Sequence, residues 1–167
     1  MQLHVSEIDS PIGPLDVVLT AGRVCAMEFS DHHERLEEAL QRGFPAATLQ
    51  VHKAPADLRA RMCAYFDGDF AALDNIEIEP HGTEFQKRVW SKLRRVEAGR
   101  TISYGGLARK IGRPGSARAV GMSNARNPIV LIVPCHRVIG ADGSLTGYGG
   151  GLQRKEWLLA HEGNRLV

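Results

Sequence analysis

A cysteine, a histidine and an arginine follow one another directly after a proline, at Pro134-Cys135-His136-Arg137. Sulfur attacks as a thiolate, and a neighbouring base or permanent positive charge favours that form. His136 can supply the base and Arg137 the charge. These residue types indicate a reactive cysteine, although a cysteine can also be no more than a small buried apolar side chain.

The other two cysteines lack such a setting. Cys25 and Cys63 lie within apolar patterns typical of a strand and a helix, where packing is the usual role. An odd number of cysteines without a CxxC spacing argues against a disulfide framework and against a common zinc module. We therefore expect free thiols in a reducing compartment, with no metal and no cofactor.

The segments around Cys135 indicate how it is positioned. IVLIV (129–133) is too short for a helix and rich in β-branched residues, which predicts a buried strand leading to the cysteine. The loop-rich VIGADGSLTGYGGG follows it. A last helix, QRKEWLLAHEG (153–163), is expected to bury Trp157 and either Leu158 or Leu159 and to end at Gly163.

The residues ahead of this strand predict three helices. Thr83 and Gln86 have the spacing of a capping box, which marks a helix start. Ser103 can cap a short helix that stops at Gly112, and the turn GRPGS leads to another, ARAVGMSNA (117–125). Two short helices joined by a tight turn are typical of a helix-turn-helix.

The N-terminal residues predict a small sheet with helices. One helix, capped by Asp31, is expected to end at Gly43, and a second follows Pro55. NIEIEP (75–80) is either a short strand or a linker. A small antiparallel meander is predicted from three alternating runs separated by turn residues, QLHVSEI (2–8), LDVVLT (15–20) and RVCAMEF (23–29).

The charge divides the 167 residues into two parts. Residues 1–80 hold 6 Lys and Arg against 14 Asp and Glu, whereas residues 81–167 hold 15 against 5. We therefore expect an acidic α/β domain at 1–80, serving as a scaffold, and a mainly helical basic domain at 81–167 that carries the site. A net charge of +10 suits a phosphate-binding surface, although a solvated basic face would have the same composition.

Nothing in the sequence indicates a membrane. No run approaches the ~18 consecutive apolar residues of a spanning helix, and the N-terminus has no secretory-signal pattern. We expect a cytoplasmic protein.

Four segments together resemble the O6-alkylguanine-DNA alkyltransferase family (methylated-DNA–protein-cysteine methyltransferases). They are HGTEFQKRVW, TISYGGLARKIGRPGSARAVG, NPIVLIVPCHRVIG and LTGYGGGLQRKEWLLAHEG, which cover residues 81–163 and include the family's PCHR signature. The first 80 residues match only in outline. The resemblance implies DNA repair by irreversible, single-turnover transfer of an alkyl group from O6-alkylguanine to a cysteine. Whether O4-alkylthymine is also a substrate stays open.

The resemblance also implies roles for the residues near the signature. Cys135 matches the alkyl acceptor, and His136 matches the base that reaches the thiol through a water. Glu162 matches the carboxylate that holds the other imidazole nitrogen, in the order nucleophile, base and orienting group. Asn127 matches a buried amide that braces the site, and Tyr104 matches the phenol that donates to the departing guanine. Arg137 is expected to be structural.

Further matches concern the DNA, which is expected to be an alkylated duplex bound from the minor groove with the damaged base flipped out of the stack. Arg118 matches the arginine that fills the vacated space. Small neighbours would let its helix approach the backbone closely; these are Ala117, Ala119 and Gly121. The family's pocket for the flipped base has its match in the carbonyl of Val138 and the backbone near Tyr148, Gly149 and Gly150. We expect a monomer; the sequence leaves cooperative binding along DNA open.

The chain departs from the family pattern in places. VEAGRT replaces the usual Ile-Pro-x-Gly-x-Thr, which can alter a turn, and Ser123 stands where alanine is common. Some relatives bind zinc in the N-terminal half through paired cysteines and histidines. Here Cys25 and Cys63 lack ligand spacing, so no zinc site is expected.

Other classes of function stay open from the residues alone. A non-catalytic module could recognise lesions and signal to other repair proteins, but it would not need Cys135. A transcription factor with a redox-sensing cysteine would require a partner cysteine nearby. A thiol protease would share the cysteine and histidine without needing Tyr104, Arg118 or a basic half.

Overall fold

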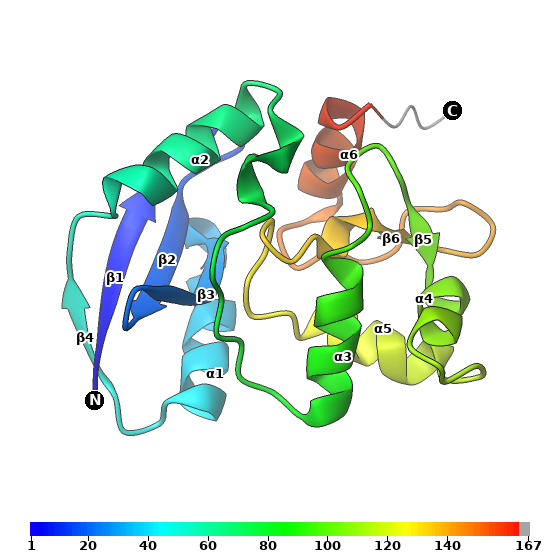
Figure 1. Ribbon diagram of the computed structural model, residues 1–167, viewed down its shortest axis with the longest axis horizontal. Coiled ribbons are helices and arrows are strands. Elements are labelled where there is room, and N and C mark those ends of the chain that lie inside the picture. The colour runs from blue at the N-terminus through cyan, green and yellow to red at the C-terminus, as the bar shows by residue number, and fades with distance from the viewer. Residues whose placement is uncertain (164–167) are drawn as a thin grey trace. The chain divides into compact units, whose positions relative to one another are not determined.

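The computed structural model describes residues 1–163, which form two compact units (Figure 1). The first unit contains Met1–His81 and also Pro128–Ile132. The second contains Gly82–Asn127 and the chain from Val133 onward. The chain therefore passes from the second unit into the first and back again immediately before Cys135.

The sheet of the first unit has the order β3-β2-β1-β4. Strands β1 (Gln2–Ile8), β2 (Leu15–Thr20) and β3 (Arg23–Phe29) form the antiparallel meander that the alternating runs predict. Strand β4 (Thr48–Val51) pairs parallel to β1, so the sheet is mixed and the prediction of an antiparallel sheet was wrong at this edge. All four residues of β4 are exposed, and no burial pattern marked the segment as a strand.

The first unit also contains helices α1 (His33–Gly43) and α2 (Ala56–Phe66). Asp31 does not cap α1, because residues Ser30–His32 form a separate short 3₁₀ helix and no side chain caps the α-helix that follows. Phe70–Leu73 form another 3₁₀ turn, η2. The core between α1 and the sheet contains Leu3, Val18, Cys25, Ala26, Leu36 and Leu40.

The segment at 75–80 is a linker rather than a strand, with a single bridge between Ile78 and Val24. The predicted strand at 129–133 was also wrong. Only one bridge forms, between Ile129 and Met27, and Leu131 has a φ of 69°, which interrupts extended backbone. Burial did follow the pattern, since every residue from Ile129 to Val133 is at most 3% exposed.

Helices are the main elements of the second unit. The capping box at Thr83 and Gln86 begins α3 (Glu84–Leu93), and the Ser103 side chain caps α4 (Tyr104–Lys110), both as predicted. The predicted second short helix is α5 (Ala117–Ala125). The remaining elements of this unit are α6 (Leu152–His161), the 3₁₀ turn η3 (Cys135–Arg137), and β5 (Ile102–Ser103), which pairs parallel to β6 (Val138–Ile139).

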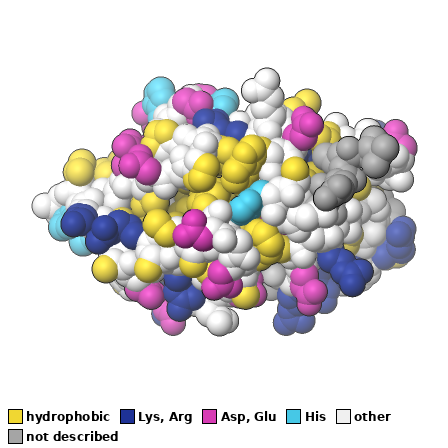
Figure 2. All heavy atoms as spheres, turned by 90° about the horizontal axis from the view of Figure 1, so that it is seen from above, with side chains coloured by type: hydrophobic (Ala, Val, Ile, Leu, Met, Phe, Trp, Pro, Cys, Tyr) yellow, Lys and Arg dark blue, Asp and Glu magenta, His cyan; other side chains and the backbone are white. Residues whose placement is uncertain are grey.

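No helix among residues 1–163 combines the length and apolar character needed to cross a bilayer. Charged side chains of both signs are spread over the face drawn in Figure 2.

Candidate active site around Cys135

Cys135 begins the turn η3 and is 5% exposed. Its N–H donates to the carbonyl of Val133 at 2.8 Å, which closes a tight turn around Pro134. The turn runs directly into β6, and the parallel pairing of β6 with β5 brings Ser103 beside Ile139. The pairing therefore places the start of α4, and with it Tyr104, near the chain that leaves the cysteine.

His136 is completely buried and contacts one carboxylate. Its Nε2 lies 2.9 Å from Oε2 of Glu162, whose residue is 4% exposed. Burial lowers the pKa of His136, so the imidazole is neutral near pH 7, with the proton on Nε2 donated to the carboxylate. Nδ1 then carries a lone pair, and it has no hydrogen-bond partner within residues 1–163.

Arg137 holds the carboxylate from its other side. Its Nε and one terminal nitrogen each donate to Glu162 at 2.9 Å, and its second terminal nitrogen donates to the Val96 carbonyl at 2.6 Å. Although burial opposes a charge at Glu162, the hydrogen bonds from Arg137 and His136 lower its pKa well below the usual range. Arg137 thus keeps the partner of His136 ionised.

Two buried amides brace the turn. Asn127 Nδ2 donates to the Val133 carbonyl at 2.8 Å, and Asn124 Nδ2 lies 3.4 Å from the Cys135 carbonyl. The sequence singled out Asn127 but missed Asn124. A polar residue at the same helical face as Val120 and Ser123 is the signal that could have found it, because those positions are buried in α5.

Lys155 is a second residue that sequence reasoning missed. It lies on α6 with 0% exposure, and its Nζ donates to the carbonyls of Val138 at 2.6 Å and Thr146 at 3.2 Å. Burial lowers its pKa. The hydroxyl of Thr146 also bonds the Tyr104 hydroxyl, so Lys155, Thr146 and Tyr104 tie the loop after β6 to α6 and α4.

The structure brings some of the expected base-pocket residues near this centre. The Tyr148 ring meets the His136 ring edge to face, with centroids 6.4 Å apart. Gly150 is buried, and Gly149 is half-buried. Val138 is fully buried, and its carbonyl already accepts the bond from Lys155, which leaves a second lone pair on that oxygen.

The expected DNA-contacting residues lie together on α5. Arg118 and Ala119 are exposed, while Ala117 and Gly121 are half-buried. A Cβ built on Gly121 would lie 3.5 Å from the Tyr104 ring, so the helix and the phenol are close neighbours. The opposite face of α5 is anchored by Trp90, whose Nε1 donates to the Ser123 carbonyl at 2.8 Å.

Ser123 departs from the family pattern, whereas Gly99, within the divergent VEAGRT, keeps the glycine of that pattern. The Ser123 hydroxyl donates to the Ala119 carbonyl at 3.0 Å, so this buried polar atom has a partner. In VEAGRT, Gly99 has a φ of 85°, and a Cβ there would lie 3.1 Å from the Glu162 carbonyl. The turn therefore needs glycine for both its conformation and its close approach to the helix end. Within residues 1–163, no cluster of three His, Cys, Asp or Glu could hold a metal ion.

Comparisons with known proteins agree on one family. Residues 84–164 match the family described as 6-O-methylguanine DNA methyltransferase, DNA binding domain. The methylated-DNA–protein-cysteine methyltransferase of Salmonella typhimurium is 44% identical over 170 residues, covering 100% of this chain and 99% of the relative. The protein of the same name from Mycobacterium leprae is also 44% identical, covering 99% and 95%.

Solved structures show the same fold. The structure of Mycobacterium tuberculosis OGT in complex with DNA superposes with a TM-score of 0.78 at 39% identity, covering 95% of this chain and 92% of that one. O6-methylguanine-DNA methyltransferase from the archaeon Pyrococcus kodakaraensis gives a TM-score of 0.71 at 29% identity, covering 97% and 99%.

Proposed function

Because this chain belongs to the methylated-DNA–protein-cysteine methyltransferase family, we propose that Cys135 accepts an alkyl group directly from O6 of a damaged guanine in DNA. The chain is a DNA repair enzyme of this class. The observation that carries the assignment of the acceptor is the pair formed by His136 and Glu162. A neutral, buried imidazole follows the cysteine, and its Nδ1 has no hydrogen-bond partner in the described part of the chain.

The reaction balances with these groups. The Cys135 thiol gives its proton to His136 Nδ1, through a water, as the sulfur attacks the alkyl carbon. The S–C bond forms while the C–O6 bond breaks, and its electron pair passes to the guanine. The imidazolium is stabilised by Glu162, which Arg137 keeps ionised. A thioether is not a leaving group at neutral pH, so each chain reacts once.

The departing guanine gains negative charge, which a hydrogen-bond donor offsets. Tyr104 supplies that donor, and its hydroxyl is oriented by Thr146. Lys155 acts as a positioning residue, because it donates to the Val138 carbonyl and to the Thr146 carbonyl. The second bond fixes the loop that continues to Tyr148, Gly149 and Gly150. Asn127 and Asn124 hold the backbone on either side of the sulfur.

The DNA partner is an alkylated duplex, which α5 enters from the minor groove. Helices α4 and α5 act as a helix-turn-helix, and Arg118 occupies the space that the flipped base leaves. The exposure of Arg118 and the small size of its neighbours support this role. The enzyme acts as a monomer in the cytoplasm, where the acceptor thiol stays reduced.

A duplex carrying isotopically labelled O6-methylguanine tests the proposal. The intact mass should rise by one methyl group per chain, with the label on the peptide that contains Cys135. Continued turnover with excess substrate, or label on Cys25 or Cys63, would overturn it. A lesion-signalling module, a redox-sensing regulator and a thiol protease would each leave the protein unlabelled.

Arg118→Ala tests the DNA part separately. Transfer from duplex DNA should slow far more than transfer from free O6-methylguanine, since the free base needs no flipping. Equal losses on both substrates would remove Arg118 from this role.

A further inference from the structure

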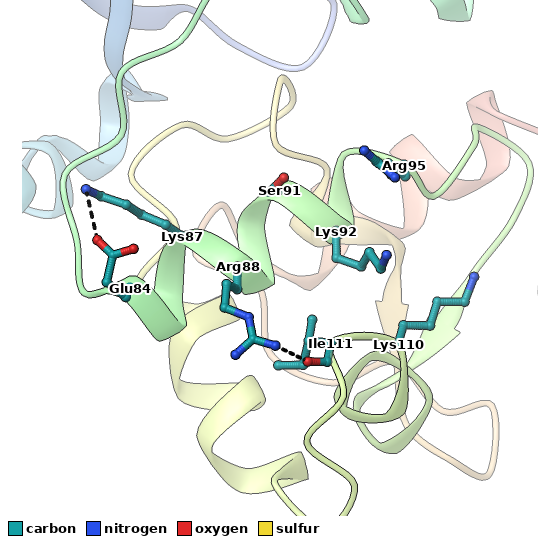
Figure 3. A pocket seen from close by; sticks show the side chains of 8 residues that line it. All are labelled: Glu84, Lys87, Arg88, Ser91, Lys92, Arg95, Lys110 and Ile111. Atoms are coloured by element: carbon teal, nitrogen blue, oxygen red, sulfur yellow. Dashed lines mark hydrogen bonds and ion pairs between the residues drawn. The ribbon is translucent and has the colours of Figure 1, made fainter.

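A basic groove lies on α3, away from α5. It is bordered by α3 and by the C-terminal end of α4, with a volume of about 370 Å³ (Figure 3). The residues that line it are Glu84, Lys87, Arg88, Ser91, Lys92, Arg95, Lys110 and Ile111. Five of these eight side chains are cationic, and one is acidic.

Some of the charges already have partners within the unit. Glu84 pairs with Lys87 at 3.9 Å. Arg88 donates to the Ile111 carbonyl at the end of α4, which covers the negative end of that helix. These contacts partly offset the two features of the groove that would repel an anion, the Glu84 carboxylate and the C-terminal end of α4.

Three cations remain available. Lys92, Arg95 and Lys110 form no ion pair with any residue in the described part of the chain. Lys92 on α3 and Lys110 on α4 extend toward the same opening (Figure 3). A second groove of about 420 Å³ shares Arg95 and Lys110 and adds Arg100 together with one acidic residue, Glu97, so the surface past the end of α3 keeps a net positive charge.

The lining indicates the class of ligand. Among residues 1–163, no aromatic side chain borders either groove, so these residues offer no platform on which an unpaired base could stack. Lys92 and Lys110 are flexible point charges, and Arg95 adds a guanidinium that can pair with a phosphate. Such groups suit phosphates along an extended backbone, and phosphate contacts carry no sequence information. Because Trp90 fixes the other side of α3 to α5, this surface is separate from the helix assigned to the minor groove.

We propose that this groove binds the phosphate backbone of duplex DNA outside the α5 contact. The inference rests on the proposed function, since it presumes that this unit works on DNA. The backbone can belong to the flank of the damaged duplex or to a second duplex. In either case the groove adds counterion release, and therefore affinity, without sequence preference.

The test uses the full chain with Lys92, Arg95 and Lys110 replaced together by Ala. The matched control replaces Arg23, Arg42 and Lys53 by Ala, which removes the same charge from exposed positions of the first unit. Binding of a labelled, undamaged duplex is measured between about 50 and 200 mM salt. We expect the slope of log K against log salt to fall by about 2 to 3 in the groove variant and to stay unchanged in the control.

Duplex length separates the two sources of the backbone. A slope difference seen with roughly 30 base pairs but not with roughly 10, about one helical turn, assigns the groove to the flank. A slope difference that persists with roughly 10 base pairs, together with a protein complex whose mass includes two short duplexes, assigns the groove to a second molecule.

Other outcomes would overturn the inference. These are an unchanged slope at every length, an equal loss in the control variant, and a loss of affinity for polyglutamate with none for DNA, which would point to an acidic protein partner. Label transfer from free O6-methylguanine to Cys135 is followed in parallel. Failure of that transfer in the unmodified protein refutes the proposed function, whereas an unchanged slope refutes only the groove.

Discussion

Cys25 and Cys135 are buried to nearly the same extent, at 2% and 5% exposure, yet their surroundings differ in kind. Cys25 lies in β3 among apolar side chains, and its thiol donates to the Val18 carbonyl at 3.4 Å. Burial raises its pKa to about 11, which keeps it protonated and inert. Cys135 is followed by a neutral imidazole that is held by an ionised carboxylate. Burial alone therefore does not decide whether a thiol reacts; the groups beside it do.

The largest expected effect separates the two cysteines outright. Cys135→Ser should abolish alkyl transfer from lesion DNA while leaving DNA binding intact, because a serine hydroxyl is a far weaker nucleophile at neutral pH. Cys25→Ser should transfer one alkyl group per chain like the parent. Single-turnover assays with labelled duplex measure alkyl transfer in both variants. Transfer that persists in Cys135→Ser would show that Cys135 is not the acceptor.

The next effect concerns the groups that make Cys135 different. Glu162→Gln keeps an acceptor for His136 but loses the charge that stabilises the imidazolium, so transfer should slow by about 10- to 1000-fold. DNA binding should be nearly unchanged. The measurement is the pH profile of single-turnover transfer, taken well below the unfolding temperature because the Arg137 charge loses its partner.

Glu156→Gln is the matched control, since Glu156 is an exposed residue of α6, the helix that ends immediately before Glu162. It should behave like the parent. If Glu162→Gln also matches the parent at every pH, the carboxylate only supports the fold.

The two environments should also respond to opposite ends of the pH scale. His136 and Glu162 have lowered pKa values in the folded state, so the unfolded chain takes up more protons and stability should fall as pH drops below about 6.5. The raised pKa of Cys25 contributes stability that is present below the ordinary thiol pKa and lost as pH rises to about 11. Urea unfolding across pH measures both limbs.

Single variants separate the loss of stability at acid pH (the acid limb) from the loss at alkaline pH (the alkaline limb). The difference between the parent and Cys25→Ala gives the alkaline contribution free of Lys155, whose lowered pKa acts in the opposite direction. Glu162→Gln should flatten the acid limb. An alkaline limb that is identical in Cys25→Ala would show that Cys25 is not its source.

The smallest effect is structural. Cys25→Ala should lower the free energy of unfolding by about 1 kcal/mol, since it removes a small buried group from the core of the first unit. Its transfer rate should equal that of the parent. A loss of transfer without a loss of stability would contradict the assignment of Cys25 to packing alone.

The sequence predicted best those elements whose signals are local. The three strands of the meander and the two short helices of the second unit were found because turn residues, caps and alternation mark their ends. Strand β4 was missed because it is exposed and pairs with a strand more than 40 residues away. The strand expected at 129–133 was not formed, because burial alone produces an apolar run whether or not the backbone is extended.

The residues of the site also divide into those that local sequence signals predicted and those that only the fold reveals. The PCHR signature and the family resemblance pointed to Cys135, His136 and Glu162, and the structure places the last two in contact. Asn124 was overlooked although the helical face that carries it is buried. Lys155 could not be found, because its importance lies in which carbonyls it reaches. A lysine in a charged helical segment is usually solvated, and only the fold reveals that this one is enclosed.

The excursion of Pro128–Ile132 has a practical consequence for dissecting the molecule. These residues belong to the first unit, where Met27 donates to the Pro128 carbonyl and accepts from the Val130 N–H. A fragment beginning at residue 82 would retain this apolar stretch without the strand that shields it. Such a fragment should aggregate, and its reactive turn should loosen, since the stretch joins Asn127 to Val133 directly ahead of the cysteine. The first unit therefore shields an apolar segment, Pro128–Ile132, that ends three positions before the nucleophile.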